Sequence, residues 1–174
     1  MRLAHTILRM TIGALFVGHG TQKLFGWFGG PGPSGAGETF EQLGLTPGRR
    51  HALAAGTAET TGGTLFLLGL ANPLAAALVC ATMITAIRRV HAKNGPWVTD
   101  NGFEYNLVLI AAALALARPR SSRDDARTEA GWAVASLAAG VAGAAGAEAA
   151  AHHEQQHQGA EVHAFARSPA AVAA

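Results

Sequence analysis

Long, nearly uncharged segments dominate the first two thirds of the chain. Between Arg50 and Arg88 the only formally charged residue is Glu59, and about 20 apolar residues suffice to cross a hydrocarbon core of about 30 Å. The stretch is therefore long enough for two crossings. Asn72-Pro73 lies at its middle, where proline fixes its own backbone and biases the preceding residue away from a helix. The pattern predicts two helices, over 51–70 and 73–90, joined by a tight reversal.

Two further apolar segments flank this pair, over 3–25 and 103–117. Together the four segments predict an all-α, four-helix transmembrane bundle. The first segment opens with Met-Arg like a secretory signal peptide, but Arg9 interrupts it and no small-residue cleavage site follows. We therefore expect this segment to remain in the protein as a span and to serve as its insertion signal.

The segments that join these helices are rich in glycine and proline. Residues 26–37, GWFGGPGPSGAG, are predicted to form a loop with no regular element, and residues 38–45 a short interfacial helix. Residues 130–147 are uncharged but consist mostly of alanine and glycine, which drive membrane insertion only weakly. They form either a fifth span or an Ala-rich helix that lies on the membrane or on the bundle.

The chain loses its apolar periodicity after Glu148, so a disordered tail is the expectation there. This pattern divides the chain into a four-helix membrane domain over 1–118, an Ala-rich extension over 119–151 and a disordered, histidine-containing tail over 152–174. The Lys and Arg residues are balanced between the two ends of the bundle, so they do not decide its orientation in the membrane.

Composition supports the membrane class and excludes others. Only 14% of the 174 residues are charged and 49% are hydrophobic, and the mean hydropathy is +0.21. The formal net charge of +2 and the absence of a basic stripe give no electrostatic footprint for nucleic acid. A single cysteine, Cys80, excludes an intrachain disulfide, a CxxC pair and a Cys-based zinc site. Without a GxGxxG or CxxCH motif, we expect no covalently bound cofactor.

Ionisable residues inside the predicted spans require a reason, because each costs at least about 2.5 kcal/mol at a helix centre. At about 100° per residue, Arg9, His19 and Lys23 fall within an arc of about 80° on the first span. Glu59 lies about 12 Å into the second span, at 1.5 Å per residue. A shared polar face of this kind points into the bundle rather than toward lipid.

Connectivity then brings several of these residues to one membrane side. The end of the first span, the start of the second, the end of the third and the start of the fourth must share that side, while Arg9 lies deeper toward the other. We predict a polar pocket for a small molecule there. Its candidate residues are Arg9, His19, Lys23, Glu59, His91 and Glu104.

Each candidate also has a structural alternative. Arg9 and Glu59 would form a buried pair that fixes helix register. Lys23 would extend its charged end to the membrane interface. Glu104 would be stabilised by the positive N-terminal end of the helix dipole. His19 would pack between helices and His91 would be solvated. Histidine-rich tracts bind divalent metals, but we predict no specific metal site from the tail histidines, which are His152, His153, His157 and His163.

Set side by side, these residues resemble the DoxX family of small bacterial membrane proteins. The similar pattern extends from Arg9 to about Arg118. It consists of Arg9 with Gly13, the run His19-Gly20-Thr21-Gln22-Lys23-Leu24-Phe25-Gly26, Phe40, Leu43-Gly44-Leu45, Glu59 with Gly62-Gly63, Leu68-Gly69-Leu70, Met83 to Ala86, His91 and Gly102-Phe103-Glu104-Tyr105-Asn106. After the fourth span the chain departs from the family pattern, because RPRSSRDDARTEAGW stands where relatives often carry Gly-Pro-Gly and Ser-x-Asp.

The resemblance implies a multi-pass protein of the bacterial cytoplasmic membrane that is linked to oxidoreductase systems. Relatives are associated with a thiosulfate:quinone oxidoreductase and with a complex that includes superoxide dismutase and a sulfurtransferase. It therefore implies a soluble oxidoreductase or sulfurtransferase as partner, but it transfers no catalytic residues and leaves open whether the chain is itself an enzyme.

Two functions are compatible with these observations. The first is a membrane component of a redox or detoxification assembly that binds a quinone or similar small molecule between its helices, with His19, Lys23 and Glu59 exchanging protons and hydrogen bonds with the quinone carbonyls. The alternative is a non-enzymatic membrane scaffold or small-solute binder, in which the same polar face only stabilises the bundle or docks a soluble enzyme.

Overall fold

The computed structural model describes residues 2–118 and 126–166, and these are helical with no strand. Six α-helices follow one another along the chain: α1 (Arg2–Phe25), α2 (Gly32–Gln42), α3 (Gly48–Leu68), α4 (Asn72–Ala86), α5 (Glu104–Ala115) and α6 (Ala126–Ala166). Two short helical turns, Ile87–His91 and Ala92–Asn94, continue α4, and two others lie within loops, at Trp27–Gly29 and Val98–Asp100. The all-α prediction and the four predicted spans are confirmed as helices, with boundaries shifted by a few residues.

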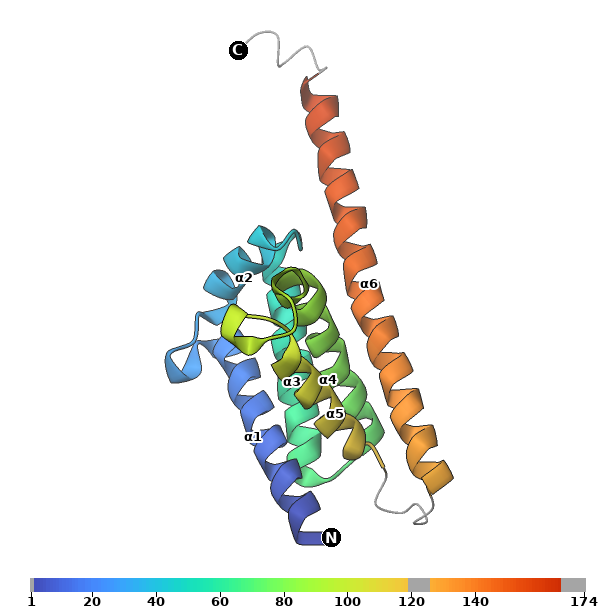
Figure 1. The fold of residues 1–174 in the computed structure, drawn as a ribbon. Coiled ribbons are helices and arrows are strands. Elements are labelled where there is room, and N and C mark those ends of the chain that lie inside the picture. The colour runs from blue at the N-terminus through green and yellow to red at the C-terminus, as the bar shows by residue number, and fades with distance from the viewer. Residues whose placement is uncertain (1, 119–125, 167–174) are drawn as a thin grey trace.

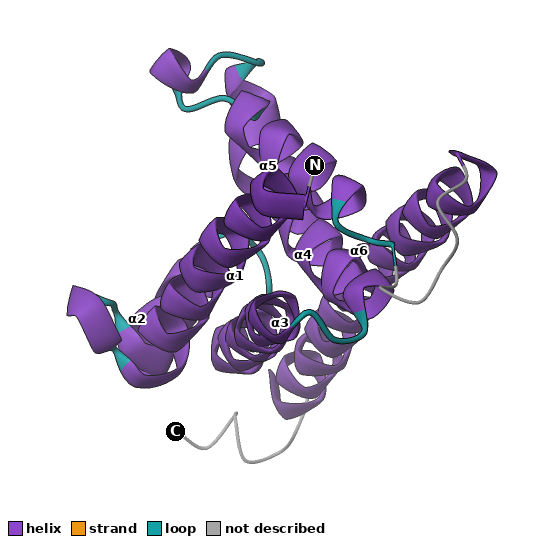
Figure 2. Ribbon diagram, turned by 90° about the horizontal axis from the view of Figure 1, so that it is seen from below, coloured by secondary structure: helices purple, strands orange, loops and turns teal. Residues whose placement is uncertain are grey.

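Helices α1, α3, α4 and α5 form the bundle (Figure 1), and α4 lies at its centre. Seen end-on in Figure 2, α4 has α3, α5 and α6 around it, and α1 packs against α3. The shared core is made mostly of small and aliphatic side chains with Phe16 and Phe66, both of which are almost fully buried.

The contact between α1 and α3 is close because glycines face glycines across it. A methyl group added to Gly63 would lie 2.6 Å from the carbonyl oxygen of Gly13 and 2.7 Å from the amide nitrogen of Val17. About two turns away on both helices, Gly20 and Gly56 meet in the same manner. Small residues at such positions let two helix backbones approach, which is how helices gain packing in a lipid environment.

The reversal between α3 and α4 lies slightly before the predicted Asn72-Pro73. Gly69 ends α3 in the left-handed conformation with φ of 67°, which glycine adopts at no steric cost. Its N–H donates to the Phe66 carbonyl and the next N–H, of Leu70, donates to Leu65, both at 3.0 Å. This is the hydrogen-bond pattern of a Schellman motif. Asn72 and Pro73 then form the first turn of α4, where proline needs no N–H.

Helix α2 corrects the prediction for the glycine-rich segment. It begins at Gly32, inside the stretch that was expected to be a loop, and ends at Gln42, before the predicted end at residue 45. Pro33 stands in its first turn, and Ala36 and Gly37 are buried. Tertiary contact with the start of α3 therefore compensates for the low helix propensity of these residues.

Helix α6 corrects the prediction for the tail. The chain remains helical from Ala126 to Ala166, so the predicted disorder from residue 152 is wrong as far as 166, and residues 167–174 lie outside the described part. The helix runs parallel to α4 along the outside of the bundle (Figure 1), with Ser136 donating to the Pro73 carbonyl and Gly140 set against Cys80. The predicted Ala-rich segment 130–147 is therefore part of a helix that packs against α4.

Two helical stretches of the described chain, Asn72–Asn94 and Ala130–Glu161, are long and apolar enough to cross a membrane. They are α4 with its extension and α6. Helices α1 and α3 have comparable length, 24 and 21 residues, but carry more polar side chains. At 1.5 Å per residue both exceed about 30 Å, the thickness of a hydrocarbon core.

Candidate functional site

A cavity of about 560 Å³ opens inside the bundle between α1, α2, α3, α4 and α5, with α6 closing part of its wall. Most of its lining is aliphatic or aromatic. Its polar and ionisable side chains are His19, Lys23, Thr39, His51, Glu59, Thr82, Thr85, Arg89, His91, Tyr105 and Asn106. A volume of this size and an apolar wall with a few polar groups are typical of small-molecule sites.

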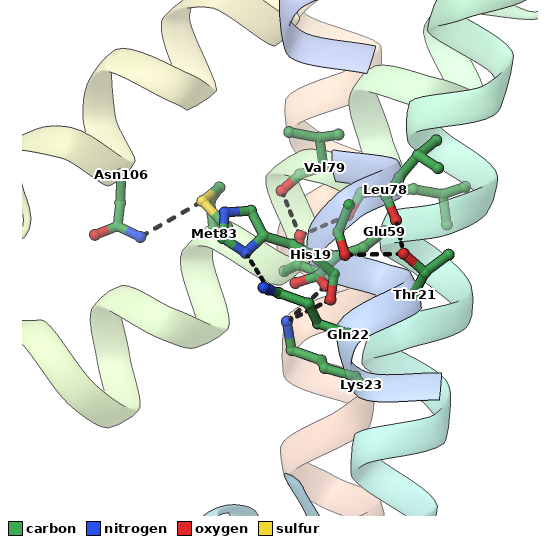
Figure 3. Close-up of polar contacts among 12 residues, drawn as sticks. His19, Thr21, Gln22, Lys23, Glu59, Leu78, Val79, Met83 and Asn106 are labelled. Atoms are coloured by element: carbon green, nitrogen blue, oxygen red, sulfur yellow. Dashed lines mark hydrogen bonds and ion pairs between the residues drawn. The ribbon is translucent and has the colours of Figure 1, made fainter. Parts of the chain in front are cut away.

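An ion pair between α1 and α3 forms the charged part of this wall. Lys23 Nζ lies 2.7 Å from Glu59 Oε2, and the Glu59 side chain is only 7% exposed against 24% for Lys23. The lysine also approaches the backbone carbonyl of His19 at 3.4 Å. Figure 3 shows the Lys23 side chain directed to Glu59, beside the His19 ring. The buried carboxylate is thus matched by a positive charge rather than left unpaired in the wall.

His19 completes the α1 contribution to the cavity. Its Nδ1 lies 3.2 Å from Gln22 Oε1, and its ring is exposed rather than packed between helices. His19 and Lys23 are four residues apart and therefore share one helix face. The bundle thus presents an imidazole, an ammonium and a carboxylate to one volume, a set that can donate, accept and exchange protons.

Of the six predicted residues, four line this cavity: His19, Lys23, Glu59 and His91. Arg9 does not, because it is about 21 Å from Lys23 along α1 at 1.5 Å per residue. Its Nη1 donates to the carbonyl oxygens of Phe66 and Leu67, at 2.6 and 2.8 Å. Arg9 therefore caps the C-terminus of α3, and the expected Arg9–Glu59 pair is wrong because Glu59 is paired with Lys23.

Glu104 is also outside the cavity. Its Oε1 accepts from the Val98 backbone N–H at 2.7 Å, so it fastens the loop before α5. His91 makes a second contact with this loop, because its Nδ1 lies 2.8 Å from the Asn101 carbonyl oxygen. His91 belongs to a π-helical turn, Ile87–His91, a local widening that is frequent at functional sites.

Sequence reasoning missed several polar residues of the wall. Asn106 is 6% exposed, and its amide nitrogen donates to Met83 Sδ at 3.4 Å in the wall of the cavity, between α5 and α4 (Figure 3). A signal for it existed, because Asn106 lies about 200° around α5 from Glu104 and therefore faces the bundle when Glu104 faces the loop. His51 and Arg89 had no comparable signal, because they lie at the ends of the predicted segments 51–70 and 73–90.

A second hollow lies on the outside of the bundle against α3 and α4. It has a volume of about 430 Å³, and its wall consists of Leu53, Ala54, Thr57, Ala58, Thr61 and Leu78. Three of these residues, Ala54, Ala58 and Leu78, also line the internal cavity. The partition between the two volumes therefore consists of two alanines and one leucine.

The described chain is thus an α-helical bundle that holds an internal ligand-sized cavity with a buried ion pair in its wall. Its family model match, DoxX, covers residues 4–92, from α1 to the π-helical turn after α4. The chain belongs to the DoxX family and is a protein associated with the lipid bilayer.

One curated relative is described as "Putative oxidoreductase CatD" of Bacillus subtilis (strain 168). It is 32% identical over 114 residues, which are 66% of this chain and 78% of the relative. No solved structure matches the chain significantly.

Proposed function

We propose that this protein is a multi-pass component of the bacterial cell membrane that binds a quinone or a similar carbonyl-bearing, lipid-soluble molecule as part of a redox system. The observation that carries the proposal is the Lys23–Glu59 pair in the wall of an otherwise apolar cavity. Lys23 and His19 supply hydrogen-bond donors for a carbonyl oxygen, and the apolar wall accepts the ring.

The chemistry of a quinone agrees with this set of groups. Its reduction to a quinol takes up two electrons and two protons, so a binding site benefits from residues that hold and exchange protons. Glu59, Lys23 and His19 serve that role here. The two electrons come from a soluble oxidoreductase partner, and the naming of the CatD relative as an oxidoreductase supports this assignment. A sulfurtransferase is the other proposed partner, without the role of electron donor.

The thin partition between the cavity and the outer hollow supports a ligand from the lipid phase. The outer hollow faces away from the bundle core against α3 and α4, and only Ala54, Ala58 and Leu78 separate it from the cavity. A small movement of Leu78 would connect them. A lipid-soluble molecule would then reach the Lys23–Glu59 pair without passing through water.

We also propose that α6 is a fifth crossing. It runs beside α4 in the same direction, with contacts from Ser136 at Pro73 to Glu148 at Arg88. Both helices are long and apolar enough to span, so a bilayer that surrounds α4 also surrounds α6. Five crossings place the two chain ends on opposite membrane sides, whereas four would place 1 and 118 on the same side.

Quinone binding is tested on the full chain purified in mild detergent. Extracted lipids are identified by mass spectrometry, and binding of an added quinone is measured by titration. Glu59→Gln removes the carboxylate charge with little change in shape and is expected to lower quinone affinity at least about tenfold, the cost of roughly one charge-assisted hydrogen bond. Glu154→Gln is the matched control, because Glu154 pairs with Arg50 at the same 2.7 Å but outside the cavity.

The outcomes separate the two functions. Loss of quinone affinity in Glu59→Gln alone, with an unchanged melting temperature relative to Glu154→Gln, supports the redox role. A protein that binds no quinone and co-purifies with no oxidoreductase is instead a scaffold or a binder of another solute. A melting temperature that falls in Glu59→Gln without any ligand effect makes the ion pair structural.

A further inference from the structure

Two histidines come together on α6, where the helix passes the start of α3. His153 and His157 are four residues apart, and their ring centroids lie 4.5 Å from each other. Both side chains are exposed. The sequence alone placed these residues in a disordered tail, where they would have no fixed relation. The helix gives them a shared face and a separation that one ion can bridge.

We propose that His153 and His157 form a two-imidazole clamp for a divalent transition-metal ion. Two histidines at i and i+4 on one helix face are an established arrangement for holding such an ion. Imidazole nitrogen suits Zn²⁺, Ni²⁺ and Cu²⁺, with the tightest binding for Cu²⁺ in the usual order of stability. Among the described residues no three His, Cys, Asp or Glu side chains gather as one metal group, so water completes the coordination.

The neighbouring contacts leave the clamp accessible and fix its position. Glu154, between the two histidines, is turned to the bundle by its ion pair with Arg50 at 2.7 Å. Gln155 donates to the Gly44 carbonyl at 3.1 Å. These two contacts attach α6 to the start of α3 and to the turn that precedes α3. The helix face that carries His153 and His157 therefore points away from the bundle. The clamp therefore lies beside the start of α3 and the Gly44 turn that follows α2.

Metal binding is tested on the detergent-solubilised full chain carrying no histidine tag. Calorimetric titration with Cu²⁺, Ni²⁺ and Zn²⁺ is expected to show one saturable site, strongest for Cu²⁺. His153→Ala and His157→Ala each remove one of the two ligands, and each is expected to weaken affinity at least about tenfold. His152→Ala is the matched control, because His152 is an exposed neighbour about 100° from His153 on the helix.

A second measurement keeps the test independent of affinity alone. An ion that bridges two turns of a helix protects its amides, so hydrogen exchange around residues 153–157 slows when Cu²⁺ is added, and this effect disappears in His157→Ala. The proposal is overturned by the absence of saturable binding, by equal affinities in all three variants, or by metal binding without exchange protection.

Discussion

The glycine contact between α1 and α3 allows a quantitative test of what holds the site together. In Gly63→Ala the added methyl would lie 2.6 Å from the Gly13 carbonyl oxygen and 2.7 Å from the Val17 nitrogen. Ordinary carbon contacts are about 3.5 Å or longer, and both obstacles are backbone. The two helices must therefore separate by several tenths of an ångström, an overpacking strain of about 1–3 kcal/mol.

Gly18→Ala is the matched control on the same helix pair. Nothing lies within 4 Å of a methyl added there, so the change only exchanges glycine for a better helix former, a gain of about 0.5–1 kcal/mol. Gly63→Ala gains the same propensity, so the two variants are expected to differ by the overpacking strain alone, about 1–3 kcal/mol in unfolding free energy. Because Lys23 and Glu59 belong to the two separated helices, Gly63→Ala is also expected to weaken ligand binding.

The assay is unfolding of the detergent-solubilised protein, followed by circular dichroism while denaturant is added. Gly18→Ala and the unmodified chain are measured beside Gly63→Ala under identical detergent conditions. Equal stability of the two alanine variants would show that α1 and α3 are not in backbone contact. Such a result would remove the physical basis for the position of the Lys23–Glu59 pair.

Three further predictions concern other contacts. Lys23→Met leaves the buried Glu59 carboxylate without its partner and is expected to destabilise the fold by about 3 kcal/mol, measured by the same unfolding assay. Arg9→Ala removes both hydrogen bonds to the end of α3 and costs about 2–4 kcal/mol without changing ligand affinity. Cys80, the only cysteine and fully buried against Gly140, is expected to resist maleimide in the native chain and to react in Gly140→Val.

The controls for these three are available in the chain. Arg50→Met removes the cation of an exposed ion pair, so its cost is expected to stay below about 1 kcal/mol, and an equal cost for Lys23→Met would contradict burial of Glu59. Loss of ligand affinity in Arg9→Ala would argue that Arg9 reaches the cavity. Gly146→Val meets no atom within 4 Å, and labelling of Cys80 in that variant would mean that α6 does not cover it.

The number of crossings has a direct test. In a Cys80→Ala background, Leu3→Cys and Ala160→Cys report on the two ends, and an impermeant maleimide is applied to sealed, uniformly oriented vesicles. Five crossings predict that only one of the two cysteines reacts, because the ends lie on opposite sides. Reaction of both cysteines from the same side would show that α6 does not cross the membrane and lies on its surface.

The sequence by itself determined the helical class and the positions of the main helices. Apolar length and the spacing of Pro and Gly are local properties, so they predicted α1, α3, α4 and α5 without knowledge of their neighbours. Connectivity also placed His19, Lys23 and His91 at one end of the bundle, because helices that alternate in direction bring alternate ends to the same side.

The tertiary structure decided which side chains meet. Arg9 and Lys23 both lie on the polar arc of α1, so the sequence does not say which of them pairs with Glu59. The close glycine contact between α1 and α3 sets the position of α3, so that Glu59 pairs with Lys23 and Arg9 binds the carbonyls at the end of α3. Helix formation by α2 and α6 has the same cause, since burial against α3 and α4 compensates for sequences with weak propensity or uniform composition. Which side chains pair depends on how each helix is rotated and how closely it approaches its neighbours. Both are set by many contacts between residues far apart in the sequence.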